Sequence, residues 1–157
     1  MEYQDLSSFI VPESFRGKSK ITVQIWWIIQ ATLFNWSPQV LYGWRAFLLR
    51  LFGAQIGKHV RIRSSVKVTY PWKVKIGEYT WIGDDCVLYS LGDITIGKHV
   101  AVAHKVYFNT GGHEYEKITF DIFSMPVVIE DECWITKHRT QRLACWKDLR
   151  RDACQAN

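Results

Sequence analysis

The sequence predicts a single-stranded left-handed parallel β-helix of hexapeptide repeats, preceded by a pair of helices. The pentapeptide IGKHV occurs at 56–60 and again at 96–100, and IGEYT lies midway at 76–80. Within each interval of twenty residues, an aliphatic or aromatic residue recurs every six positions. Because a repeat of fixed period determines the architecture of its chain, we expect stacked coils of three short strands each.

The first residue of each hexad is expected to point inward and to stack on its equivalent in the next coil. These residues are Ile56, Ile62, Val68, Ile76, Ile82, Leu88, Ile96, Val102 and Phe108. Four glycines are expected at corners, where either a positive φ or a close approach of two backbones favours this residue. They are Gly57, Gly77, Gly83 and Gly97.

Two apolar runs with helical spacing precede the repeats, at 21–34 and 40–52. A turn at 35–38 separates them, and Gly53 suits the end of the second helix. The first run is short for a membrane span. Two interpretations therefore remain open: the helices pack on the rest of the protein or on a subunit, or they lie on a membrane surface, where tryptophans and arginines are favoured.

The chain is accordingly divided into three parts. Residues 1–53 form an N-terminal segment with two helices, residues 54–136 form the β-helix with a loop insertion at 111–127, and residues 137–157 form an aberrant basic tail. This tail holds six Lys or Arg against two Asp, which is most of the net charge of +5. Since the charge is confined to a tail without hexads, we expect no nucleic-acid partner.

The cysteine pattern and the N-terminus indicate the compartment. The four cysteines form no CxxC pair and suggest no disulfide framework, which favours a reduced cytoplasmic setting. The first residues lack the basic and apolar regions of a secretory signal.

Four motifs carry a resemblance to a known family: YPWKVKIG at 70–77, WIGDDCVLYSLGDITIG at 81–97, NTGGHEY at 109–115 and PVVIEDECWI at 126–135. With them, the chain resembles the hexapeptide-repeat acetyltransferases of exopolysaccharide synthesis, in particular the colanic acid biosynthesis acetyltransferases. It is similar in turn to galactoside and maltose O-acetyltransferases. The resemblance implies a homotrimer with active sites between neighbouring subunits. It also implies transfer of an acetyl group from acetyl-CoA to a sugar hydroxyl, with no metal.

The resemblance also implies the site residues. His113, in the loop that interrupts the coils, matches the general base, and a neutral imidazole suits that role near neutral pH. Ser90, Asn109 and Glu114 are assigned to the acceptor substrate; Ser90 stands where relatives have Asn. Trp134 matches a position on the acetyl-CoA side.

The family pattern stops after residue 136, where relatives continue with further coils. Read one base further on, the codons of 143–155 permit a closing segment of the family type. We therefore interpret the tail as the product of an internal deletion with a change of reading frame. The missing coils lead us to expect weak or no acetyl transfer by this chain, and an exposed strand edge at 128–135.

Two other functions remain open from the sequence. His99 and His104 have the spacing of two zinc ligands in γ-carbonic anhydrases, which are also β-helical, although a third ligand is required. Alternatively, the chain is an inactive pseudo-enzyme or a structural β-helix protein.

Overall fold

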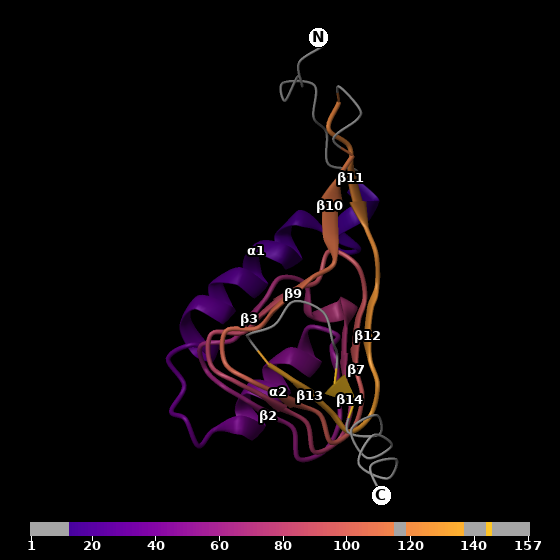
Figure 1. The fold of residues 1–157 in the computed structure, drawn as a ribbon. Coiled ribbons are helices and arrows are strands. Elements are labelled where there is room, and N and C mark those ends of the chain that lie inside the picture. The colour runs from indigo at the N-terminus through magenta and orange to yellow at the C-terminus, as the bar shows by residue number, and fades with distance from the viewer. Residues whose placement is uncertain (1–12, 115–118, 137–143, 146–157) are drawn as a thin grey trace, which may run out of the picture.

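The computed structural model describes residues 13–114, 119–136 and 144–145. Its chain runs round three parallel sheets in turn, so that each coil contributes one strand to each sheet (Figure 1). The first sheet holds β1 Gln55–Ile56, β4 Val74–Ile76, β7 Ile94–Ile96 and β12 Val127–Ile129. The second holds β2 Arg61–Ile62, β5 Trp81–Ile82, β8 Ala101–Val102 and β13 Cys133–Ile135. The third holds β3 Lys67–Val68, β6 Val87–Tyr89 and β9 Tyr107–Asn109.

The register of the strands confirms the predicted repeat. In the first sheet Ile56 pairs with Ile76, Ile76 with Ile96, and Ile96 with Ile129. All nine predicted hexad leaders are buried, with exposed fractions between 1% and 7%. One continuous core therefore runs through the coils, formed by like residues stacked on like residues.

Close backbone approach explains the corner glycines. A Cβ atom on Gly77 would lie 2.6 Å from the carbonyl carbon of Gly97, and one on Gly97 would lie 2.6 Å from the backbone nitrogen of Asp131. Positive φ angles occur elsewhere at this corner, at His59 and Tyr79 (56° and 59°). Of the two reasons considered from the sequence, the structure supports the stacking of neighbouring coils at these two glycines.

The helical pair is present, with an irregularity in its first member. Ser19 accepts a hydrogen bond from the Thr22 N–H (3.3 Å) and so caps α1, Lys20–Ile29. The helix continues as a π-helical turn, η3 Gln30–Phe34, and α2 spans Tyr42–Leu51. Two short 3₁₀ turns complete the helical elements, η2 Glu13–Arg16 and η4 Pro71–Lys73. Among the described residues, none of the helices has both the length and the apolar character needed to cross a bilayer.

The helices cover the open edge of the first coil. The Trp26 indole N–H donates to the Val68 carbonyl (2.8 Å), and the Val68 N–H donates to the Gln30 side chain (2.6 Å). Arg50 Nε donates to the Ile56 carbonyl (3.0 Å). These side chains bond strand-edge groups that would otherwise pair with another chain. Of the two interpretations left open by the sequence, packing of the helices on the coil is therefore observed.

Arg45 is the buried centre of this cap. Its guanidinium donates to the carbonyls of Ile62 (2.6 Å), Pro38 (2.9 Å) and Gln39 (2.6 Å), and to the Ser37 hydroxyl (2.8 Å). Burial lowers the pKa of Arg45. The side chain thus ties the turn between the two helices to the edge of β2.

Two antiparallel pairs interrupt the parallel order. Within the predicted loop insertion, β10 Gly111–His113 pairs with β11 Ile122–Ser124, and this hairpin projects from one corner of the coil (Figure 1). At the other end of the chain, β14 Ala144–Cys145 pairs with β13. The β13 edge, predicted from the sequence to be exposed, is thus covered in part. The rest of the predicted basic tail, 137–143 and 146–157, lies outside the described residues.

Candidate active site

The hairpin that carries His113 is fixed at its base. The buried Thr110 hydroxyl donates to the Tyr89 carbonyl (2.6 Å), so the chain leaves the third sheet at a defined point. Gly112 follows, where a Cβ atom would lie 2.6 Å from Cζ of Phe123. Because glycine has no Cβ atom, the Phe123 ring can lie against the backbone at this position while the two strands of the hairpin pair.

His113 is oriented by Phe120. The two rings are stacked, with centroids 4.2 Å apart and planes at 6°. His113 Nδ1 lies 2.9 Å from the Phe120 carbonyl oxygen. Because a carbonyl oxygen only accepts, Nδ1 carries the proton in this contact, and Nε2 is the basic nitrogen of the neutral ring.

A small apolar cluster packs against the hairpin through Ile122. Ile122 of β11 packs against a buried group formed by Val23, Tyr70 and Leu91. Val23 belongs to α1, so the cluster joins the hairpin to the helical pair. The position of His113 therefore depends on elements that are far apart in the sequence.

Lys73 contributes a partly buried charge beside this cluster. Its Nζ donates to the Phe15 carbonyl (2.7 Å) and to the Leu91 carbonyl. Burial lowers the pKa of Lys73, while the nearby Asp93 raises it. With two carbonyl acceptors, this ammonium connects the N-terminal turn to the third corner of the coil.

Two further predicted residues lie near His113 in the chain and in the fold. Glu114 follows it directly, and its N–H donates to the Asp121 carbonyl (2.8 Å) across the hairpin. Asn109 is exposed at the hairpin base, where its side-chain oxygen accepts from the Gly111 N–H (3.0 Å). Three of the five predicted site residues thus lie on the hairpin or directly beside its base.

Ser90, which the resemblance assigned to the acceptor substrate, lies inside the coil. It is fully buried, and its hydroxyl both donates to the Tyr70 carbonyl (3.0 Å) and accepts from the Tyr70 N–H (2.8 Å). Both hydrogen bonds are internal, so the hydroxyl does not reach an acceptor substrate. Its role here is to bridge two coils, in the position that Thr110 occupies one coil later.

Trp134 is separated from the hairpin within one chain. It lies on the outer face of β13, in the second sheet, with half of its surface exposed. Its strand neighbours are Ala101 and Ala144. In Figure 1 the β10–β11 hairpin projects from a corner of the coil, whereas β13 belongs to the second sheet, away from that corner.

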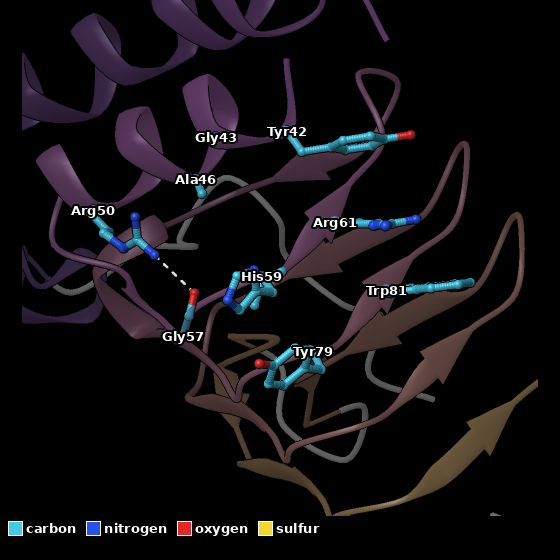
Figure 2. A pocket seen from close by; sticks show the side chains of 10 residues that line it. Tyr42, Gly43, Ala46, Arg50, Gly57, His59, Arg61, Tyr79 and Trp81 are labelled. Carbon is cyan, nitrogen blue, oxygen red and sulfur yellow. Dashed lines mark hydrogen bonds between the residues drawn. The ribbon is translucent and has the colours of Figure 1, made fainter. Parts of the chain in front are cut away.

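A pocket of about 480 Å³ lies between α2 and the coil, and it was not predicted from the sequence. Figure 2 shows Tyr42, Arg61 and Trp81 in a column along one side of it. The Arg61 guanidinium lies 4.9 Å from the Trp81 ring centre and 6.0 Å from that of Tyr42. The sequence could have indicated this arrangement, because Arg61 and Trp81 are twenty residues apart and occupy equivalent outward positions of β2 and β5.

The two histidines considered as zinc ligands lie at different corners. The His99 ring stacks on Tyr79 at 5.1 Å, and His104 Nδ1 accepts from the Asp84 N–H (2.9 Å). In the part of the chain that the structure describes, no group of three His, Cys, Asp or Glu side chains could hold a metal ion. The geometry therefore lends no support to the zinc-enzyme alternative.

Solved structures with the same fold define the class. The chain is similar to a maltose O-acetyltransferase from Clostridium difficile 630, with a TM-score of 0.66 and 23% identity over 75% of this chain and 66% of that one. It is equally similar to the hexapeptide-repeat acetyltransferase VCA0836 from Vibrio cholerae, with a TM-score of 0.66 and 22% identity over 78% of this chain and 73% of that one. The three-sheet coil with its helical cap is therefore the fold of the hexapeptide-repeat acetyltransferases.

The sequence comparison identifies the family within this class. The chain is 59% identical over 132 residues to the colanic acid biosynthesis acetyltransferase WcaF of Escherichia coli K12, which covers 84% of this chain and 72% of the relative. The protein of that name from Shigella flexneri matches equally well. No family model matches the sequence. The chain belongs to the family of colanic acid biosynthesis acetyltransferases.

Proposed function

We propose that this chain is an acetyl-CoA-dependent O-acetyltransferase that acts on a sugar hydroxyl in the synthesis of a colanic acid-like exopolysaccharide. His113 is the general base. Asn109, at the base of the hairpin, and Glu114, directly after His113, contact the acceptor. The names of the relatives support the acetyl transfer and the pathway, and the orientation of His113 supports the chemistry.

The hydrogen bond from Nδ1 to the Phe120 carbonyl carries the proposal. It holds the neutral imidazole with Nε2 as the basic nitrogen, which is the form required to take a proton from a hydroxyl. As Nε2 removes this proton, the sugar oxygen attacks the thioester carbonyl carbon. The C–S bond then breaks, and the leaving thiolate takes the proton back from the imidazolium. The products are the acetyl ester and CoA.

Trp134 is the proposed contact for acetyl-CoA. The acetyltransferase VCA0836 has been solved in complex with this compound. In this chain, Trp134 presents a half-exposed ring beside the small Ala101, a surface suited to an alkyl chain such as pantetheine. The donor thus lies along the outer face of the second sheet.

The proposal includes the assembly and setting expected from the sequence. The coil is left-handed, and the chains form a homotrimer in the cytoplasm. Because His113 belongs to the β10–β11 hairpin and Trp134 to the second sheet, a site that uses both is proposed to form with a neighbouring subunit. The helical pair makes peripheral contact with a membrane.

The test compares His113→Ala with the wild-type chain in two assays. The first measures CoA release from acetyl-CoA with methyl glycosides of common hexoses, and the second measures acetyl-CoA binding by calorimetry. We expect His113→Ala to lower kcat by about 10²–10⁴-fold while acetyl-CoA binding is retained. Equal kcat values for the two proteins would overturn the assignment of the base.

Trp134→Ala tests the donor site, with Trp81→Ala as its matched control. Trp81 lies on the outer face of the same sheet, with an exposed fraction of 54% against 50% for Trp134. We expect Trp134→Ala to weaken acetyl-CoA binding about tenfold or more, as for loss of an aromatic contact, and Trp81→Ala to leave it unchanged. Loss of binding in both variants, or in neither, would contradict the assignment.

The inactive-scaffold alternative predicts a different outcome. In that case the wild-type chain neither binds acetyl-CoA nor releases CoA with any acceptor, although it folds. Acceptor-dependent release of CoA by the wild-type chain would exclude it.

A further inference from the structure

The helical end of the molecule has an exposed apolar surface. Residues of α1, η3, α2 and the turn between them are buried on the side that faces the coil and exposed on the other side. The exposed apolar residues, hereafter the helical face, are Ile21, Ile25, Trp27, Ile28, Leu33, Trp36, Val40, Leu41, Trp44, Phe47 and Leu51. An accumulation of exposed apolar side chains of this size is typical of an interaction site.

The members of the helical face are connected to one another. The Trp44 indole N–H donates to the Leu33 carbonyl (3.1 Å), and the Trp44 and Phe47 rings stack at 5.8 Å. A shallow apolar pocket of about 390 Å³ lies between Leu33, Trp36 and Leu41. The most exposed member is Trp36, with 86% of its surface accessible.

From Ile21 to Phe47 no exposed charged side chain interrupts the helical face, and the exposed Arg50 lies beside its last member, Leu51. Between Ile21 and Leu49 the sequence has one charged residue, Arg45, and this residue is buried in the cap. The middle of the helical face is therefore uncharged, and it could contact a partner whose own contact layer is apolar.

Cations, without acids, occupy the segments on both sides of the helical pair in the sequence. From residue 14 to residue 77 the sequence has eleven Lys or Arg and no Asp or Glu. Three of these cations, Lys58, Arg61 and Lys67, are exposed on the first coil, which is the coil that the helices cover. Lys18 and Lys20 are exposed at the start of α1. Exposed apolar residues together with cations suit a partner that offers both apolar chains and phosphate groups, as a phospholipid layer does.

A second copy of the chain that presents its own helical face fits this arrangement poorly. Two helical faces in contact would bring two sets of cations of the same sign together, which is unfavourable. An anionic bilayer is complementary in both respects. Tryptophans and aliphatic residues enter its interfacial layer, and Lys and Arg approach its phosphates.

We infer that the helical face lies on the surface of an anionic phospholipid bilayer, with the first-coil cations against the lipid phosphates. Membrane contact by the helical pair is part of the proposed function, and this inference rests on that part only. It requires no acetyl transfer, and so it stands or fails separately from the roles of His113 and Trp134.

The experiment is sedimentation with vesicles, using the full chain. One set of vesicles is phosphatidylcholine alone, and the other contains about one third phosphatidylglycerol, which gives a negative surface potential. We expect binding to the anionic vesicles that weakens as salt is raised, because salt screens the cations. Absence of sedimentation with the anionic vesicles would overturn the inference.

Two pairs of variants test the surface. Trp36→Gln removes the most exposed apolar residue and is expected to weaken vesicle binding about tenfold; Trp81→Gln, on the second coil, should not change it. Lys58→Glu should weaken binding more than fivefold, as about 1 kcal/mol per cation implies, whereas Lys98→Glu should not. Lys58 and Lys98 are matched, since both are exposed in an IGKHV sequence, two coils apart.

Thermal melting verifies that all four variants fold. Equal effects of Lys58→Glu and Lys98→Glu would show non-specific charge attraction and contradict the inference. Sedimentation equilibrium without vesicles tests the remaining alternative, in which the helical face binds a second copy of the chain. Self-association of the wild-type chain that is lost in Trp36→Gln would assign the helical face to a second copy instead.

Discussion

The imidazole of His113 lies parallel to the ring of Phe120, at a centroid distance of 4.2 Å, while its Nδ1 is hydrogen-bonded to the carbonyl of the same residue. One residue thus determines both the plane of the imidazole and the position of its proton. Phe120 has a φ of 50°, which turns its carbonyl and its ring toward the opposite strand. The candidate base is therefore held by a residue that no sequence motif indicated.

Phe120→Gly tests this relationship. Glycine keeps the positive φ and the carbonyl acceptor and removes only the ring. We expect kcat for acetyl transfer to fall up to about tenfold, because a stacked ring pair contributes about 0.5–1.5 kcal/mol, with an unchanged KM for acetyl-CoA. Phe123→Leu, on β11 of the same hairpin, is the control and should keep the wild-type kcat. An unchanged kcat in Phe120→Gly would show that the ring does not orient His113.

Gly77→Ala is expected to destabilise the coil. The new methyl group would meet the backbone of Gly97 at 2.6 Å, and backbone atoms of a stacked coil move only together. We expect a loss of about 1–3 kcal/mol in the free energy of unfolding, measured with urea. Gly43→Ala is the control: it lies in α2 with no atom within 4 Å and should stabilise by up to about 1 kcal/mol. Similar values for the two variants would contradict the close-approach explanation.

Arg45→Met is expected to loosen the helical cap. The substitution leaves the carbonyls of Ile62, Pro38 and Gln39 without their donor. We expect the free energy of unfolding to fall by about 3–5 kcal/mol, since several charge-assisted bonds are lost at a buried site. Arg61→Met, at an exposed position, should change it by less than about 0.5 kcal/mol.

Arg45→Lys provides a second measurement if Arg45→Met does not fold. Lysine keeps the charge but cannot reproduce the planar set of donors, so we expect an intermediate loss. Wild-type stability of Arg45→Lys would show that charge alone matters at this position.

Ser90→Ala separates a structural role from acceptor binding. Removing the hydroxyl leaves the buried N–H and carbonyl of Tyr70 without a partner, at a cost of about 1–3 kcal/mol in the free energy of unfolding. The KM for the acceptor should not change. Ser90→Thr should keep the stability, because Thr110 occupies the equivalent position in the next coil.

Asn109→Ala is the converse variant. Asn109 is exposed, so we expect little change in stability and a higher KM for the acceptor. A raised acceptor KM in Ser90→Ala, at unchanged stability, would instead restore Ser90 as a substrate contact.

The periodic part of the fold was predictable. Identical pentapeptides forty residues apart, with a related one midway, predicted the pairing of Ile56, Ile76 and Ile96, because stacked coils place like residues on like residues. The reason for the corner glycines was left open, since a positive φ and a close approach both favour glycine. Only the distances between coils distinguish the two at Gly77 and Gly97.

By itself, the sequence determined the coil, the helical pair and the place of His113 in a segment that interrupts the coils, because each depends on local order or on a fixed period. Tertiary structure decided the contacts between distant elements: Arg45 with the edge of β2, Ser90 with Tyr70, and His113 with Phe120. These contacts have no period and lie between segments whose approach depends on packing. For the same reason, the sequence indicated the apolar helices, but only the fold showed that one side of them is exposed while the other covers the first coil, where cations are exposed.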